Sequence, residues 1–156
     1  MTAEEWREVH GWPDYRVSNL GRVASHKGAQ PRMLSQVLVG RPGLEYPRVT
    51  LSGPGRRQLR SVHSLVAEAF IGPRPSGLDV RHLDGDRYNP RASNLRFGTR
   101  SENMQDSVAH GTHPMASKTH CLRNHEFTAQ NTLLSGGKRY CRACRRDRQA
   151  AAGVSA

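Results

Sequence analysis

The chain has 156 residues, of which 35% are hydrophobic and 6% aromatic, a low apolar content for a single large core. This composition favours small modules, some of them stabilised by a bound metal. Lys and Arg number 24 against 13 Asp and Glu, a formal net charge of +11 at pH 7. The basic excess indicates a polyanionic partner, because each neutralised phosphate releases counterions; a basic face turned to water is the alternative.

No apolar run approaches the ~20 residues needed to cross a membrane, and the residues from Met1 to Trp6 lack the basic start and apolar stretch of a secretory signal. We therefore expect no membrane contact and a cytoplasmic location. The three cysteines all follow residue 120 and cannot all pair, so in a reducing cytosol they indicate a metal site. No feature indicates an obligate protein partner.

Residues 1–60 are predicted to form a small β module. Two short alternating runs, 15–17 and 21–23, are hinged at 18–20 and predict a hairpin; longer β-like runs follow at 33–39 and 46–51. Its arginines either face water or form a platform for DNA. The segment Trp-Pro-Asp-Tyr-Arg-Val-Ser-Asn-Leu-Gly-Arg-Val, with Glu-Trp-Arg before it, resembles the nuclease-associated modular domain of phage HNH endonucleases, which implies a role in placing a nuclease on DNA.

Residues 61–110 predict a helix followed by a strand, a loop, a strand and a second helix. Ser61 can cap the first helix, over 62–70, whose apolar residues form one stripe; His63 beside the stripe is interpreted as a packing or hydrogen-bonding histidine. Strands are expected near 78–83 and 95–98. Thr99 and Glu102 have capping-box spacing for a helix over 100–110. In such a ββα unit His82 and Asn103 can face the same cleft.

These residue types suit hydrolysis of a phosphodiester. His82 can act as a base, because an ordinary histidine is largely neutral and still basic near pH 7. Asn103 offers the neutral oxygen that Mg²⁺ or Mn²⁺ accepts. Arginines that can hold the phosphate backbone are Arg81, Arg87, Arg91, Arg96 and Arg100. A strand histidine with two turn or cap asparagines, Asn94 and Asn103, is the alternative.

Residues 62–71, 82–86 and 94–103 together resemble the HNH homing endonuclease family, which has a ββα-metal fold. The resemblance implies that His82 is the general base, that Asn94 braces the loop and orients this histidine, and that Asn103 is the metal ligand. Arg81 departs from relatives that carry an acidic residue or asparagine there. We expect a metal held by Asn103, DNA phosphate and water, with Arg81 on a phosphate; an inward Asp84 or Asp86 is the alternative, although their segment is typical of a turn.

After a linker at 111–118, residues 119–149 predict a zinc ribbon with a basic helix. Cys121, His125, Cys141 and Cys144 form two close pairs that suit a closed tetrahedral Zn²⁺ site, and 135–137 predict a hairpin turn between them. Free thiols and a surface histidine are the alternative. Arg142, Arg145 and Arg146 are expected to contact phosphates. Residues 150–156 are expected to be disordered.

The whole chain is therefore predicted to have an α+β fold with an N-terminal β module, a central ββα-metal unit and a C-terminal zinc ribbon. The expected function is that of a metal-dependent DNA endonuclease of the HNH homing type, acting on double-stranded DNA in a bacterial or phage-infected cell. A DNA-binding regulator with a vestigial nuclease site is the main alternative. An RNA-binding zinc protein is less favoured, because stacking aromatics are scarce after residue 97.

Overall fold

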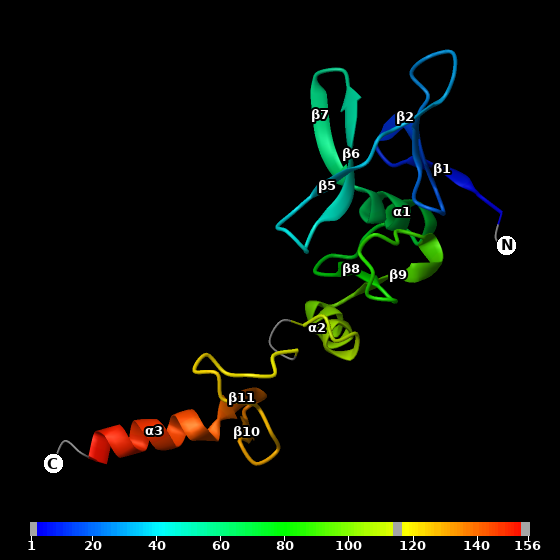
Figure 1. Cartoon of the computed structure of the whole chain (residues 1–156). Coiled ribbons are helices and arrows are strands. Elements are labelled where there is room, and N and C mark those ends of the chain that lie inside the picture. The colour runs from blue at the N-terminus through cyan, green and yellow to red at the C-terminus, as the bar shows by residue number, and fades with distance from the viewer. Residues whose placement is uncertain (1–2, 114–116, 154–156) are drawn as a thin grey trace. The chain divides into compact units, whose positions relative to one another are not determined.

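The computed structural model describes residues 3–113 and 117–153, which fall into two compact units, Met1–His110 and Gly111–Ala156 (Figure 1). The expected α+β class is confirmed by the small sheets and three helices. The expected division near residue 60 does not separate two compact units, because both predicted modules contribute to one core. Within the described residues, no helix is long and apolar enough to cross a membrane.

The N-terminal sheet has the order β1-β2-β3-β4 with antiparallel neighbours. Its strands are β1 Trp6–Val9, β2 Trp12–Ser18, β3 Val23–Ser25 and β4 Arg32–Met33. Tyr15 and Val17 of β2 are buried and Arg16 between them is exposed, as a half-buried strand requires; Trp12 and Ser18 are also buried, outside this alternation. The predicted hinge closes the β2–β3 turn, where the N–H of Arg22 donates to Ser18 Oγ at 3.0 Å. The hairpin prediction is confirmed.

A second antiparallel sheet has the order β5-β6-β7. Its strands are β5 Val37–Val39, β6 Tyr46–Gly53 and β7 Arg56–Ser61. The run expected over 33–39 is split between the two sheets. Leu34 donates its N–H to Val23 O at 2.8 Å, and the Gln36 side chain donates to Gly21 O at 2.8 Å, so the chain turns away before β5.

Helix α1, Val62–Phe70, connects the two predicted modules through its buried face. Ser61 is its N-cap residue, but its side chain makes no capping hydrogen bond, contrary to expectation. The shared core consists of Val9, Trp12, Tyr15, Val17, Val23, Val49, Leu51, Val62, Leu65, Val66, Ala67 and Leu95. Arg7 extends this contact from β1, because its guanidinium donates to Ala69 O at 3.0 Å and lies over the Phe70 ring.

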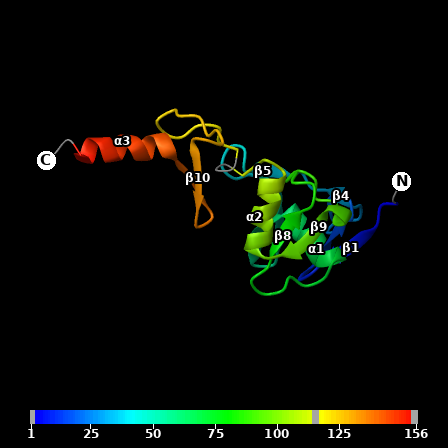
Figure 2. The ribbon, with the colours of Figure 1, turned by 90° about the horizontal axis from the view of Figure 1, so that it is seen from below.

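The hairpin of β8, Asp79–His82, and β9, Leu95–Gly98, lies between α1 and α2, as Figures 1 and 2 both show. Helix α2, Arg100–Ala109, begins with the predicted capping box. Glu102 N–H donates to Thr99 Oγ1 at 3.2 Å, and Thr99 N–H donates to Glu102 Oε2 at 2.7 Å. The sequence Thr99-x-x-Glu102 thus fixes where α2 starts.

In the unit Gly111–Ala156, β10, Thr132–Ser135, pairs with β11, Lys138–Cys141, and helix α3, Arg142–Gly153, follows. The structure closes the predicted hairpin with a two-residue turn, Gly136 and Gly137, which both have positive φ, 55° and 70°, as such a turn requires. The disorder expected from residue 150 is wrong as far as Gly153, because the alanine-rich segment continues α3. Residues 154–156, and 114–116 of the expected linker, lie outside the described residues.

Candidate active site and metal site

His82 is the last residue of β8 and is only 8% exposed. Its ring belongs to a ring cluster that we define as Tyr46, His63 and His82, contributed by β6, α1 and β8. Burial lowers the pKa of His82, and Arg87 acts in the same direction, whereas Asp84 and Asp86 raise it. The net direction keeps the imidazole neutral at pH 7, the state in which it can accept a proton.

Asn94 braces the loop between β8 and β9 through three hydrogen bonds. Its Oδ1 accepts from the N–H of Asp84 at 3.0 Å, and its Nδ2 donates to Asp84 Oδ1 at 2.8 Å and to Asn89 O at 2.9 Å. The side chain does not reach His82; the contact runs through the backbone, where Leu83 N–H donates to Asn94 O at 2.9 Å. Asn94 therefore fixes the turn that follows His82.

Asp84 and Asp86 shape this turn, as the sequence indicated. Asp84 Oδ1 accepts from the N–H of Asp86 at 2.8 Å, and its Oδ2 accepts from Asn89 at 2.7 Å. Asp86 Oδ1 accepts from the N–H of Tyr88 at 2.8 Å. Both carboxylates are thus engaged within the loop.

Asn103 lies in the first turn of α2 and is partly buried. Its backbone N–H donates to Thr99 O at 3.0 Å, and its carbonyl accepts from Ser107 Oγ at 3.0 Å. No side chain among residues 3–113 hydrogen-bonds to its amide, which leaves the amide oxygen available to a ligand. That Asn103 and His82 face one cleft stays a prediction, supported by the packing of α2 against β8.

Arg81 was expected to hold a phosphate, but in the structure its guanidinium contacts two carboxylates. Its Nε and Nη2 donate to the two oxygens of Asp106 at 2.8 and 2.9 Å, and its Nη1 lies 3.1 Å from Glu102 Oε1. The side chain is 16% exposed. A Cβ on Gly98 would lie 2.3 Å from Arg81 Cδ, so this glycine leaves the space that the arginine fills. Arg81 joins β8 to α2, and its guanidinium is engaged by two carboxylates of that helix.

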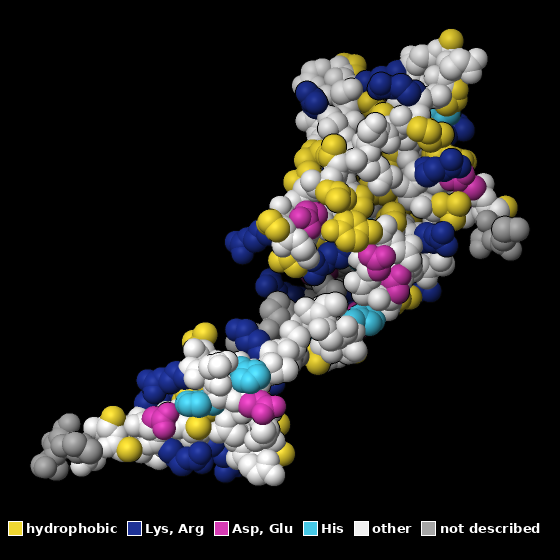
Figure 3. Space-filling view, in the orientation of Figure 1, with side chains coloured by type: hydrophobic (Ala, Val, Ile, Leu, Met, Phe, Trp, Pro, Cys, Tyr) yellow, Lys and Arg dark blue, Asp and Glu magenta, His cyan; other side chains and the backbone are white. Residues whose placement is uncertain are grey.

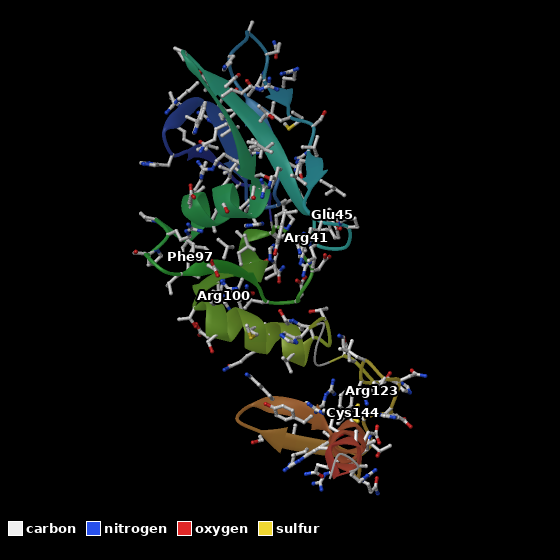
Figure 4. All side chains as sticks on the ribbon, turned by 90° about the vertical axis from the view of Figure 1, so that its left-hand side faces the viewer. Arg41, Glu45, Phe97, Arg100, Arg123 and Cys144 are labelled. Atoms are coloured by element: carbon white, nitrogen blue, oxygen red, sulfur yellow. The ribbon has the colours of Figure 1, made fainter. Side chains whose placement is uncertain are left out.

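The other arginines of this region are more open. Arg91, Arg96 and Arg100 are exposed, and Figure 4 labels Arg100 beyond Phe97 at the start of α2. Arg87 is half-buried: it donates to Gly43 O at 2.8 Å, in the β5–β6 connection that Arg41 and Glu45 mark in Figure 4. On the face in Figure 3, Lys and Arg side chains lie at several separate places on each unit.

The Ser18–Gly21 turn of the N-terminal motif packs directly on the loop between β8 and β9. Ala92 N–H donates to Asn19 O at 2.8 Å. Gly21 has φ of 88°, and a Cβ there would lie 2.3 Å from Pro90 Cγ. The asparagine and glycine of the motif therefore position the loop that carries Asn94, a function that the sequence pattern did not reveal.

The second unit brings together Cys121, His125, Cys141 and Cys144, whose ligand atoms lie within 4.8 Å of one another. Cys144 Sγ lies 3.5 Å from Cys121 Sγ and 3.3 Å from His125 Nδ1, which in turn lies 3.7 Å from Cys141 Sγ. Bonds of about 2.0–2.3 Å to a tetrahedral ion separate ligand atoms by about 3.3–3.8 Å, so the group fits a metal. Figure 4 labels Cys144 near Arg123, which pairs with Asp147 of α3.

The surroundings of the thiols also suit a cation. The N–H of Cys144, 3.4 Å from Cys141 Sγ, lowers the pKa of Cys141 to about 6. Burial and the two other thiols raise the pKa of Cys144 to about 11. A bound cation would relieve the repulsion between the thiolates. Asn131 donates to Cys141 Sγ at 3.5 Å and accepts from the N–H of Ala143 at 2.9 Å. Asn131 had no sequence signal; it supports the ligands from outside.

The structure has a buried histidine at the end of a strand, a loop braced by an asparagine and a following helix in which the Asn103 amide has no side-chain partner among residues 3–113, an arrangement that suits a ββα nuclease. Residues 60–105 match the family model described as HNH endonuclease, and residues 4–52 match the NUMOD4 motif. The chain belongs to the HNH homing endonucleases.

The chain is 34% identical over 109 residues to the DNA endonuclease I-HmuI of Bacillus phage SP01, covering 69% of this chain and 60% of that protein. It is 34% identical over 111 residues to the uncharacterized HNH endonuclease L247 of Acanthamoeba polyphaga mimivirus, covering 68% and 26%. A solved structure, titled DNA binding and cleavage by the HNH homing endonuclease I-HmuI, matches with a TM-score of 0.60 and 33% identity over 69% of this chain and 60% of that one. The chain thus spans 60% or less of the length of each of these relatives.

Proposed function

We propose that this chain is a metal-dependent endonuclease that hydrolyses phosphodiester bonds of double-stranded DNA. The observation that carries the proposal is His82, which is buried at the end of β8, has a lowered pKa and is followed by a loop that Asn94 holds by three hydrogen bonds. A neutral base fixed in this way can take a proton from water without first losing one of its own.

The proposed roles follow from the contacts. His82 accepts the proton of the attacking water, and Asn94 keeps the loop beside it in place. Asn103 would hold a divalent cation, Mg²⁺ or Mn²⁺, together with DNA phosphate and water. When bound, such an ion offsets the negative charge that grows on the phosphate. Both carboxylates of the Asp84–Asp86 turn are engaged by the loop itself, which supports this arrangement over an inward aspartate.

The arginines that remain as proposed phosphate contacts are Arg87, Arg91, Arg96, Arg100, Arg142, Arg145 and Arg146. Arg145 and Arg146 are exposed on α3, the helix that also carries Cys144. Contacts of this kind contribute to DNA affinity more than to sequence specificity. We further propose Zn²⁺ for the Cys₃His group, because three thiolates and one imidazole in a closed tetrahedron are typical of structural zinc.

One observation favours a second candidate, a DNA-binding regulator without nuclease activity. Within residues 3–113 and 117–153, only the C-terminal group brings three or more Cys, His, Asp or Glu ligands together. At the nuclease site Asn103 would thus be the main protein ligand of the ion, which predicts weak metal binding before DNA arrives.

Supercoiled plasmid incubated with the purified chain separates the two candidates. The nuclease predicts nicked or linear product with Mg²⁺ or Mn²⁺, none with EDTA, and much less with Asn103→Ala at equal DNA binding. The regulator predicts binding without metal-dependent cutting at any pH between about 6 and 9. Reading nicked and linear products separately also shows whether one strand or both are cut.

A further inference from the structure

The ring cluster contains polar atoms that have neither a partner in the fold nor a role in the proposed reaction. Among the described residues, three buried side-chain nitrogens lack a hydrogen-bond partner, namely Arg48 Nε, His63 Nδ1 and His82 Nε2. A buried unsatisfied polar atom costs about 1–3 kcal/mol, so such atoms are rare and call for a cause. Two of the three belong to neighbouring imidazoles, and one of these is the proposed general base.

The two imidazoles are in direct contact. The ring centroids of His63 and His82 lie 5.1 Å apart, and the planes are inclined at 85°. At this separation one nitrogen of each ring can come within hydrogen-bond reach after a small rotation, or a single buried water can join them. Tyr46 packs edge-on against His63 with centroids 4.9 Å apart and limits the freedom of that ring.

We propose that His63 is a positioning residue for His82, with His63 Nδ1 accepting a hydrogen bond from the Nε2–H of His82, directly or through one water. This inference rests on the proposed function. The hydrogen bond fixes the tautomer of His82, because a proton held on Nε2 leaves Nδ1 unprotonated and able to accept the proton of water. A histidine that only fills space would leave both tautomers populated.

The charges around the pair agree with this assignment. Burial, followed by the nearby His82, Arg48 and Arg74, lowers the pKa of His63 to about 4. His63 is therefore neutral at any working pH and can offer an acceptor nitrogen, whereas a protonated ring would offer only donors. The charged groups that face His82 are Asp84, Asp86 and Arg87, and none of them hydrogen-bonds to its Nε2.

Two substitutions of His63 separate hydrogen bonding from packing. In His63→Asn the side-chain oxygen lies near the place of Nδ1 and keeps an acceptor, whereas His63→Phe keeps an aromatic ring and removes it. We expect His63→Phe to lower the single-turnover rate of plasmid cleavage about 10- to 100-fold with unchanged DNA affinity, and His63→Asn to recover most of that loss. Equal rates for wild type and His63→Phe, or equal losses in both variants, would overturn the proposal.

A second readout needs no activity and applies to the wild-type chain. Imidazole ¹⁵N NMR distinguishes the two neutral tautomers, and the signals of His82 are those missing from His82→Ala. The expected result is a proton on Nε2 of His82 in the wild type and a mixture of tautomers in His63→Phe. A proton on Nδ1 in the wild type overturns the inference. A chain that shows the expected tautomer but cuts no DNA would instead overturn the proposed function.

Discussion

Arg81 and Asp106 form a two-point ion pair between β8 and α2, with Nε–Oδ2 and Nη2–Oδ1 distances of 2.8 and 2.9 Å. The pair sets the position of the helix that carries Asn103 against the strand that carries His82. Glu102 shares the same guanidinium while closing the capping box at the start of α2. Arg81 thus has a structural role, because it joins the strand that carries His82 to the helix that carries Asn103.

Removing the charge of Asp106 should destabilise the unit Met1–His110. Asp106→Asn leaves a mostly buried guanidinium with one carboxylate, so we expect the free energy of unfolding to fall by about 1–3 kcal/mol. Urea denaturation measures this change. Gln105→Ala, at an exposed position of the same helix, is the matched control and should cost less than about 0.5 kcal/mol. Equal effects of the two substitutions would show that the pair does not stabilise the unit.

The same pair predicts a pH dependence. The hydrogen bond from Arg81 lowers the pKa of Asp106 in the folded chain. A carboxyl with a lowered folded pKa stabilises the fold above its unfolded pKa of about 4, and this stabilisation is lost as the pH falls through the folded value. The difference in unfolding free energy between wild type and Asp106→Asn should therefore shrink between about pH 6 and pH 3. A difference that stays constant over this range would contradict the assignment.

The contact between the N-terminal motif and the β8–β9 loop can be isolated with substitutions at two glycines. Gly21→Ala introduces a Cβ that would lie 2.3 Å from Pro90, whereas Gly11, with φ of 72°, has nothing within 4 Å of the same addition. Both substitutions strain a positive φ. The additional decrease in the free energy of unfolding in Gly21→Ala, about 1–3 kcal/mol in thermal unfolding, therefore measures the loop contact. We also expect slower DNA cleavage in Gly21→Ala alone. Identical melting temperatures and rates would exclude the proposed coupling.

The metal group predicts a local effect of ligand loss. His125→Ala should lower bound zinc from about one ion per chain and unfold the unit Gly111–Ala156, which has little core besides the metal. The unit Met1–His110 should keep its melting transition, because its core is its own. His120→Ala is the control, since His120 lies outside the ligand group. Metal analysis and calorimetry measure both effects; full zinc content in His125→Ala would contradict the four-ligand site.

Features set by local spacing were predictable from the sequence. The capping box needs only Thr99 and Glu102 three residues apart, and the tight hairpin turn needs only Gly136 and Gly137. The Cys₃His group was likewise found from its two close pairs. In each case the interaction involves neighbours along the chain or a residue type with few other uses.

Features that depend on packing between distant segments were not predictable. The partner of Arg81 lies 25 residues away on another element, and its choice depends on how α2 packs on β8. Tyr46 enters the ring cluster only because β6 and α1 meet. The shared core across residue 60 could not be predicted for the same reason, since apolar residues from both sides of the expected division complete it.

The central claim, that His82 is the general base of a DNA-cleaving site, is tested most directly by His82→Ala. Single-turnover cleavage of supercoiled plasmid with Mg²⁺ should fall by at least about 100-fold, because a positioned base contributes that much or more to such a step. DNA binding by the same preparation should be unchanged, which shows that the fold is intact. Cleavage by His82→Ala at the wild-type rate would contradict the account.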